Sequence, residues 1–328
     1  MLNTLAAKQA IDPSRTSALR NAFAKASRKR FQQLLKTLNE VVIEDDAFGL
    51  VANKRPGPRA FAFPRTADKV AAFMKWFREQ VIDDILQVTQ IERVGESVEN
   101  AWTNPFIRDA YKRGIQKARV QIIKGENSVS GLNVNARAPR IRSRKRTPTI
   151  KETGGVDVSL LNPLHEERLN ILYSRTFTEL KGVTDAMEQH IARVLSEGIA
   201  NGVGPKELAR HMVRVVSGGG GTLSTTDSLG RFIPATRRAE MIARTEIIRA
   251  HAEAQLTEFQ AWGVHGVVAK AEILTTKDER TCPRCLRLEK QVFTIDEARG
   301  VIPVHVMCRC IWVPFIEKQP KKGKHNYE

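Results

Sequence analysis

Two short segments near the C-terminus organise this chain: DERTCPRC at Asp278–Cys285 and PVHVMCRC at Pro303–Cys310. They hold all four cysteines of the 328-residue sequence, and a histidine lies three residues before the second cysteine pair. Cys-x-x-Cys is the spacing with which a tight turn directs two thiolates at one tetrahedral metal ion. The pattern therefore predicts a structural zinc site made by four of five residues: Cys282, Cys285, His305, Cys308 and Cys310.

Other interpretations of the cysteines stay open at this point. Disulfides across the two pairs would close the same loop in an oxidising compartment, and a reduced, metal-free thiol cluster would pack without either. Cys308 and Cys310 are two residues apart, so in a strand they point to opposite faces, which favours only one of them as a ligand. A redox-active pair of the thioredoxin type is disfavoured, because the sequence around it does not predict a βαβ unit. Cys308 as a nucleophile with His305 as its base is also disfavoured, because no third group that would orient the histidine can be inferred. We therefore predict no catalytic site.

The charge balance points to polyanionic partners. The chain has 53 Lys and Arg against 36 Asp and Glu, a net charge of +17. Such an excess favours nucleic acid first and acidic protein surfaces second, although a merely solvated basic surface is the simpler alternative. The sequence contains no run of about 18 apolar residues, so we expect no membrane span. The N-terminus does not resemble a secretory signal. Clustered cysteines favour a reducing cytoplasm or a particle assembled within one.

Apolar periodicity predicts a mainly α fold of the α+β class, with a small β-containing Cys/His knuckle at 278–310. The first 125 residues give a basic amphipathic helix opened by Asp12-Pro13, a helix capped by Thr66 and a third helix. β-branched runs predict short strands beside the cysteines. The other expected helices cover 104–124, 162–198, 205–216 and 234–262, and the expected strands cover 264–275, 292–295 and 311–313.

A basic segment interrupts the helical pattern. Between residues 126 and 157 come Arg137, Arg140, Arg142, Arg144, Lys145 and Arg146, without an acidic residue among them. Such a segment cannot bury enough apolar area to order itself, so we expect a mobile arm. Its charges suit DNA phosphates, and a plain linker is an equally good interpretation.

A second charged group accompanies the cysteines. Arg244, Glu246 and Arg249 lie on one predicted helix, while Asp278 and Arg280 precede the first cysteine pair. We expect these five residues to form ion pairs that clamp the helix onto the knuckle, a scaffold role rather than acid–base catalysis.

The order of these motifs resembles a known family. The resemblance lies in three segments in order: Ile242-Ala243-Arg244-Thr245-Glu246, the segment 278–285, and Pro303-x-His305-x-x-Cys308-Arg309-Cys310. In these segments the chain resembles the head-morphogenesis domain of tailed bacteriophages, the phage Mu protein F family of minor head proteins. The likeness covers about residues 160–315. The chain departs from it at Glu272–Leu274, where a tryptophan is usual, at His251 for an asparagine, and at Lys290 for a glycine.

The resemblance implies a minor capsid protein that works in head assembly or DNA packaging at the portal vertex. Its partners would be portal protein, major capsid or scaffolding proteins, and packaged DNA, within a virion assembled in the bacterial cytoplasm. Some relatives carry a C-terminal toxin enzyme, for which the eighteen residues after Cys310 leave no room. The alternatives are a free nucleic-acid-binding zinc-knuckle protein and a metal-dependent nuclease that uses His305.

The expected division of the chain follows from both arguments. A helical N-terminal region, 1–125, would dock on portal or capsid, and the basic arm would cover 126–157. The head-morphogenesis domain would cover 158–318 and contain the knuckle, and a disordered tail would cover 319–328.

Overall fold

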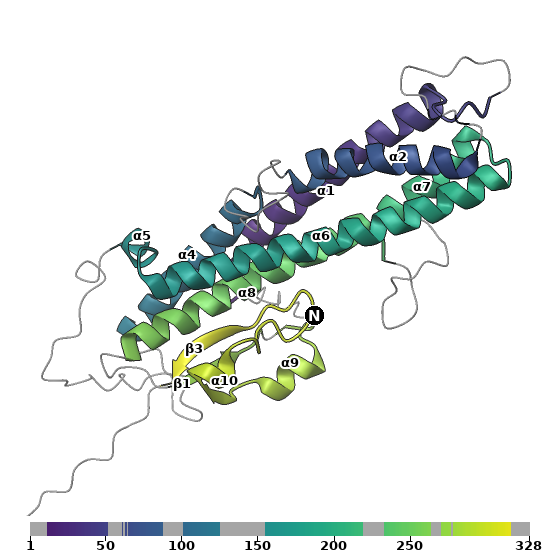
Figure 1. The fold of residues 1–328 in the computed structure, drawn as a ribbon. Coiled ribbons are helices and arrows are strands. Elements are labelled where there is room, and N and C mark those ends of the chain that lie inside the picture. The colour runs from purple at the N-terminus through teal and green to yellow at the C-terminus, as the bar shows by residue number, and fades with distance from the viewer. Residues whose placement is uncertain are drawn as a thin grey trace, which may run out of the picture. The chain divides into compact units, whose positions relative to one another are not determined.

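The computed structural model describes residues 12–51, 61, 63, 65–87, 101–124, 155–218, 233–263, 270–276 and 278–315. Within these residues the chain is mainly helical with one small antiparallel sheet near the C-terminus, which confirms the predicted fold class (Figure 1). Residues 126–154 of the basic arm, which include all of its predicted DNA-binding residues, and the tail lie outside the described residues. No helix that the structure describes is long and apolar enough to span a bilayer.

The chain divides into two compact units. Unit 1 comprises Met1–Ser17, Arg108–Leu169 and Ile247–Glu328, and unit 2 comprises Ala18–Ile107 and Asn170–Glu246. The borders fall inside helices α4 (Asn104–Lys124), α6 (Pro163–Ala200) and α8 (Ala235–Gly263). The division expected from the sequence stays a prediction.

Unit 2 is built from helices alone. Helix α1 (Ser17–Asn39) ends in a π-helical turn, η1 (Glu40–Glu44), and α2 (Thr66–Val81) ends in a second one, η2 (Ile82–Leu86). Helix α7 (Pro205–Ser217) and parts of α6 and α8 complete the unit. The apolar stripe of α2 lies in this core, with Phe73, Phe77 and Val81 fully buried, as its spacing predicts.

Helix α1 begins four residues later than the Asp12-Pro13 signal suggests. The Asp12 carboxylate accepts hydrogen bonds from the backbone N–H and the hydroxyl of Ser14, at 3.0 and 2.7 Å. A short polar side chain that bonds its neighbours offers the backbone a turn in place of a helix. The helix therefore starts at Ser17.

Unit 1 combines helices with the sheet. Strand β1 (Lys270–Leu274) lies between β2 (Val292–Thr294) and β3 (Ile311–Phe315), and both pairings are antiparallel. Helix α5 (Val156–Ser159) and the short helices α9 (Pro283–Leu288) and α10 (Ile295–Ala298) also belong to this unit. Its core joins α8 side chains such as Phe259 to Ile273, Trp312 and three cysteines, so the cysteine region is part of the hydrophobic interior.

The predicted helices α4, α6, α7 and α8 form within two residues of their expected ends. The expected strand at 264–275 is formed over 270–274, and residues 264–269 lie outside the described part of the chain. Helices α9 and α10 were not predicted, because six and four residues are too few to show a helical period.

Candidate metal centre

The first cysteine pair is held by a tight turn. Cys282 is the N-cap of α9, its Sγ accepts a hydrogen bond from the backbone N–H of Cys285 at 3.4 Å, and Pro283 occupies the first turn. Proline suits that position because its fixed φ is helical and its missing N–H would have had no partner. The turn follows β1, so the sheet fixes the place of both sulfurs.

The second segment brings its donor atoms to Cys285. His305 Nε2 lies 3.2 Å from Cys285 Sγ, and Cys308 Sγ lies 4.0 Å from the same sulfur. The donors of Cys282, Cys285 and His305 are mutually within 4.8 Å, as are those of Cys285, Cys308 and Cys310. In tetrahedral zinc, two sulfurs are about 3.8 Å apart, and a sulfur and a nitrogen are about 3.5 Å apart. The structure thus gathers the predicted ligands in two groups of three that share Cys285, each at a spacing compatible with metal binding.

The tautomer of His305 suits coordination. Its Nδ1 lies 2.7 Å from the carbonyl oxygen of Val306, and because a carbonyl only accepts, Nδ1 carries the proton. The lone pair is then on Nε2, the nitrogen that faces Cys285. Metal-binding histidines are commonly oriented by such a bond from their other nitrogen.

A cavity of about 30 Å³ adjoins these donors. Cys282, Cys285, His305 and Cys310 line it, together with Met307, Arg280 and Arg309. That volume holds one water-sized guest. The thiols and the imidazole that line it are groups that bind metal ions.

The four thiols are unpaired in the structure and differ in acidity. A hydrogen bond from the Cys310 thiol lowers the pKa of Cys308 to about 5, while the pKa of Cys310 is raised because that thiol donates and is buried. Burial and the nearby Cys308 raise the pKa of Cys285 to about 12. Burial opposes ionisation of Cys282, but hydrogen bonds from the Cys285 and Arg284 N–H groups outweigh it and lower its pKa. Without metal the cluster thus carries its charge chiefly at Cys308, and a metal ion would displace further protons.

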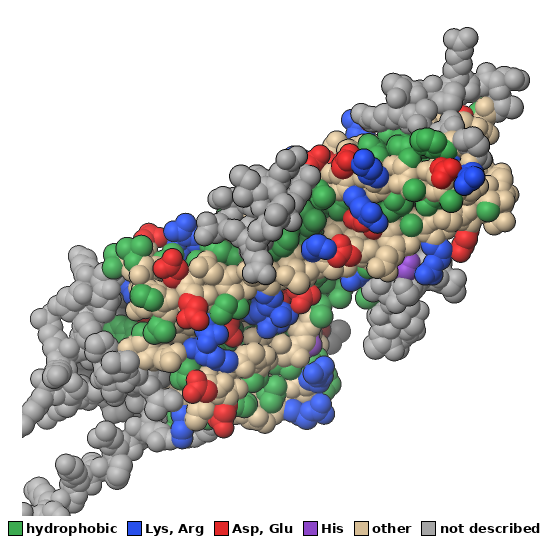
Figure 2. All heavy atoms as spheres, in the orientation of Figure 1, with side chains coloured by type: hydrophobic (Ala, Val, Ile, Leu, Met, Phe, Trp, Pro, Cys, Tyr) green, Lys and Arg blue, Asp and Glu red, His purple; other side chains and the backbone are tan. Residues whose placement is uncertain are grey.

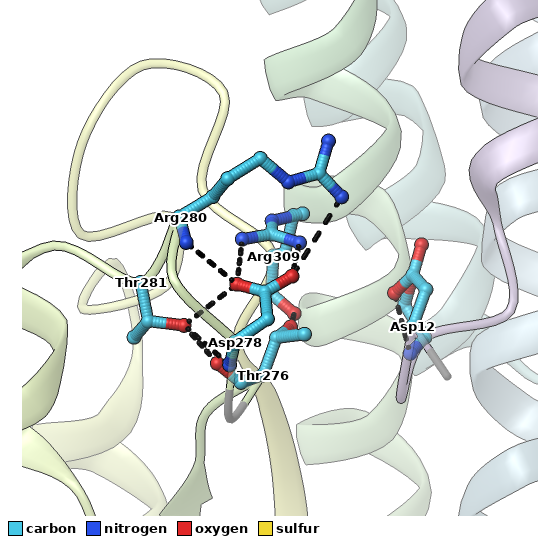
Figure 3. Close-up of polar contacts among 7 residues, drawn as sticks. Asp12, Thr276, Asp278, Arg280, Thr281 and Arg309 are labelled. Atoms are coloured by element: carbon cyan, nitrogen blue, oxygen red, sulfur yellow. Dashed lines mark hydrogen bonds and ion pairs between the residues drawn. The ribbon is translucent and has the colours of Figure 1, made fainter. Parts of the chain in front are cut away.

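Asp278 links the two cysteine segments (Figure 3). Its carboxylate accepts a fork of two hydrogen bonds from the Arg309 guanidinium, at 2.5 and 2.7 Å, and this fork holds the pKa of Asp278 well below its usual range. The same carboxylate accepts from the hydroxyl of Thr281 at 3.1 Å and from the backbone N–H of Arg280 at 3.1 Å. Arg309 lies between Cys308 and Cys310, so one side-chain pair connects both halves of the motif.

The other predicted ion pairs have different partners. Arg244 donates to Asn21 at 2.7 Å, and Glu246 pairs with Arg175 at 3.4 Å, all within unit 2. Arg249 is half-buried on α8 in unit 1. Arg280 meets Asp278 at 3.6 Å but is 80% exposed. The expected clamp of α8 on the knuckle stays a prediction. The short ion pair of Asp278 is formed with Arg309, and sequence spacing could not match these two residues because they are 31 positions apart.

Comparison with protein families identifies the region that contains this site. Residues 189–313 match the family model described as phage Mu protein F like protein. No curated protein and no solved structure matches the chain significantly.

The matched region includes both cysteine pairs, His305 and the Arg244–Glu246 segment. Over these residues the chain is similar to the phage Mu protein F like family, which confirms the resemblance seen in the sequence.

Proposed function

We propose that this chain is a non-enzymatic minor capsid protein of a tailed bacteriophage that acts at the portal vertex during head assembly. The observation that carries the proposal is the match over residues 189–313, which contains every donor of the Cys/His cluster. The donors gathered beside the cavity are thiols and an imidazole, which are typical ligands of structural zinc and favour a structural role.

We expect the Cys/His cluster to perform this structural role by binding zinc. Cys282, Cys285 and His305 provide three ligands, and Cys308 or Cys310 provides the fourth. A closed four-ligand site contributes folding energy and leaves no open position for catalysis. The ion would join the turn after β1 to the segment before β3 and so fix the end of the small sheet.

Metal analysis of the purified full chain tests the zinc site. We expect about one zinc per chain in the wild type, following the single closed site. Cys285→Ser should lose the ion, and only one of Cys308→Ser and Cys310→Ser should lose it. Leu286→Ser, which alters an exposed neighbour, is the matched control. A metal-free wild type with four titratable thiols would reject the zinc site in favour of a reduced cluster.

Co-sedimentation tests the place of action. The chain should sediment with portal protein in procapsids, whereas a free nucleic-acid-binding knuckle protein would stay in the supernatant and show sequence-dependent binding. A nuclease would instead cleave DNA with a divalent metal and lose that activity in His305→Ala.

Contact with packaged DNA is expected to involve the arm at Arg137–Arg146, outside the described residues. Figure 2 shows basic and acidic side chains interspersed on the described face that it presents, with neither sign gathered in one area. The charges from Arg137 to Arg146 all have the same sign, which suits a run of phosphates and supports a DNA contact there.

A further inference from the structure

The Asp278–Arg309 pair stands out among the polar contacts of unit 1. Its two hydrogen bonds are short and charge-assisted, at 2.5 and 2.7 Å, and both side chains are only 16–17% exposed. A bidentate fork fixes orientation as well as distance, which a single lysine contact does not. The pair therefore constrains the backbone on both sides of it.

The fork belongs to a larger set of bonds that tie the same segments. Thr281 donates to Asp278 and also to the carbonyl oxygen of Thr276, at the end of β1. Thr276 in turn donates to the carbonyl oxygen of Arg309 at 3.5 Å. Figure 3 shows the contacts of Arg280, Thr281 and Arg309 converging on the Asp278 carboxylate, with Thr276 beside Thr281. The turn that carries Cys282 is thereby bonded to the segment that carries Cys308 and Cys310.

We propose that Asp278 and Arg309 are positioning residues, which hold the Cys308–Cys310 segment against the Cys282–Cys285 turn so that donors from both face one metal ion. Cys308 is 1% and Cys310 is 2% exposed, so this placement also shields their sulfurs. The role in metal binding rests on the proposed zinc site, while the shielding of the thiols does not. Outer partners that orient metal ligands typically change metal affinity by about 10–100-fold when removed.

Two measurements on the full chain test the inference, with Asp278→Asn, Arg309→Gln and the double variant. The first is zinc affinity, measured by competition with a chelator, together with the absorption spectrum of the cobalt-substituted protein. Each single variant should weaken binding by about 10–100-fold and change the cobalt spectrum. The double variant should be no weaker than the singles, because both act through one contact.

The second measurement is the alkylation rate of Cys308 and Cys310 in metal-free protein, followed by mass spectrometry. Both thiols should react faster in the variants than in the wild type. Asp109→Asn is the matched control, because it breaks an exposed ion pair with Arg113 of α4, at 3.0 Å, and should change neither measurement. Circular dichroism will test whether each variant keeps its helices, and Arg309→Lys serves as a milder change if Arg309→Gln unfolds.

The outcomes separate this inference from the zinc proposal. A wild type that binds no zinc contradicts the zinc site alone, and the alkylation rates then decide the positioning role. A wild type that binds zinc, with variants equal to it in affinity, spectrum and alkylation rate, overturns the inference. Single-variant effects that add fully in the double variant also overturn it, because the two residues would then act independently.

Discussion

At the scale of single residues, Gly114 marks the closest approach of α4 to α8. A Cβ at this position would lie 2.4 Å from the backbone oxygen of His251 and 2.6 Å from Ala254 Cβ. Neither atom is the end of a flexible side chain, so the helices would have to separate. We predict that Gly114→Ala lowers the free energy of unfolding by about 1–3 kcal/mol, measured by urea denaturation.

Gly182 is the matched control for that prediction, because it lies inside α6 and a Cβ there would meet nothing within 4 Å. Gly182→Ala should stabilise the protein by about 0.5–1 kcal/mol through helix propensity. Equal effects of the two substitutions would contradict the close approach at Gly114.

His251 makes stability depend on pH. Burial lowers its pKa to about 4, with the charges of Asp12, Lys117 and Arg113 acting on it more weakly, and its Nε2 has no hydrogen-bond partner among the described residues. An unfolded histidine has a pKa of about 6.5, so below that pH the unfolded chain takes up a proton that the folded chain excludes. The contribution of neutral His251 to the free energy of unfolding is therefore fully present above pH 6.5. It is lost as the pH falls toward 4, and the total loss is about 3 kcal/mol.

The test compares the wild type with His251→Gln by urea denaturation across this pH range. The variant should be less stable at pH 7.5 but lose less stability on acidification, because other carboxyl groups titrate equally in both proteins. Parallel curves for the two proteins would show that His251 is not buried in the neutral form.

At the scale of elements, a buried charge network joins helices of unit 1. Glu258 of α8 accepts from Arg119 Nε of α4 at 2.7 Å and from Trp262 at 2.8 Å, and it lies 3.3 Å from His165 Nε2 of α6. Burial opposes ionisation of Glu258, but the hydrogen bonds from His165, Arg119 and Trp262 outweigh it and lower its pKa. The three helices thus depend on one carboxylate.

Glu258→Gln would leave the Arg119 guanidinium buried without its counter-charge. We predict a loss of about 3–5 kcal/mol in the free energy of unfolding, as is typical when one partner of a buried pair is removed. Asp185→Asn, which breaks the exposed pair with Lys181 on α6, should cost at most about 0.5 kcal/mol. Similar losses from both changes would contradict the burial of the network.

Periodicity was enough to predict the long helices, because stripes such as Phe73, Phe77 and Val81 repeat with the helical period and are buried. Cysteine spacing was enough to predict a Cys/His cluster that could bind a metal, whereas the choice of ligands within it stays a prediction. The Asp278–Arg309 fork and the Glu258–Arg119 pair span 31 and 139 residues. Which residues pair over such distances is determined by tertiary packing, and no local sequence pattern indicates it.

At the scale of the whole molecule, the net charge of +17 sets the expected behaviour toward DNA. Changing Arg137, Arg140, Arg142 and Arg144 to Gln should weaken the dependence of DNA affinity on salt concentration. The slope of log affinity against log salt concentration should become smaller by about one for each charge that contacts a phosphate. The measurement is a salt titration of binding to duplex DNA.

A charge-matched control separates the arm from net charge. Changing Lys25, Lys29, Lys75 and Lys290 to Gln removes four exposed charges elsewhere and should leave the slope nearly unchanged. If the arm variant keeps the wild-type slope, the arm is a plain linker.

We propose both that zinc holds the Cys/His cluster together and that the chain acts in phage head assembly. The most direct test is to purify procapsids and measure zinc and portal protein per copy of this chain in the same sample. We predict about one zinc per chain, the content of a single closed site, and a fixed ratio of chain to portal protein. A chain that is absent from portal-containing particles, or present in them without zinc, would contradict the account.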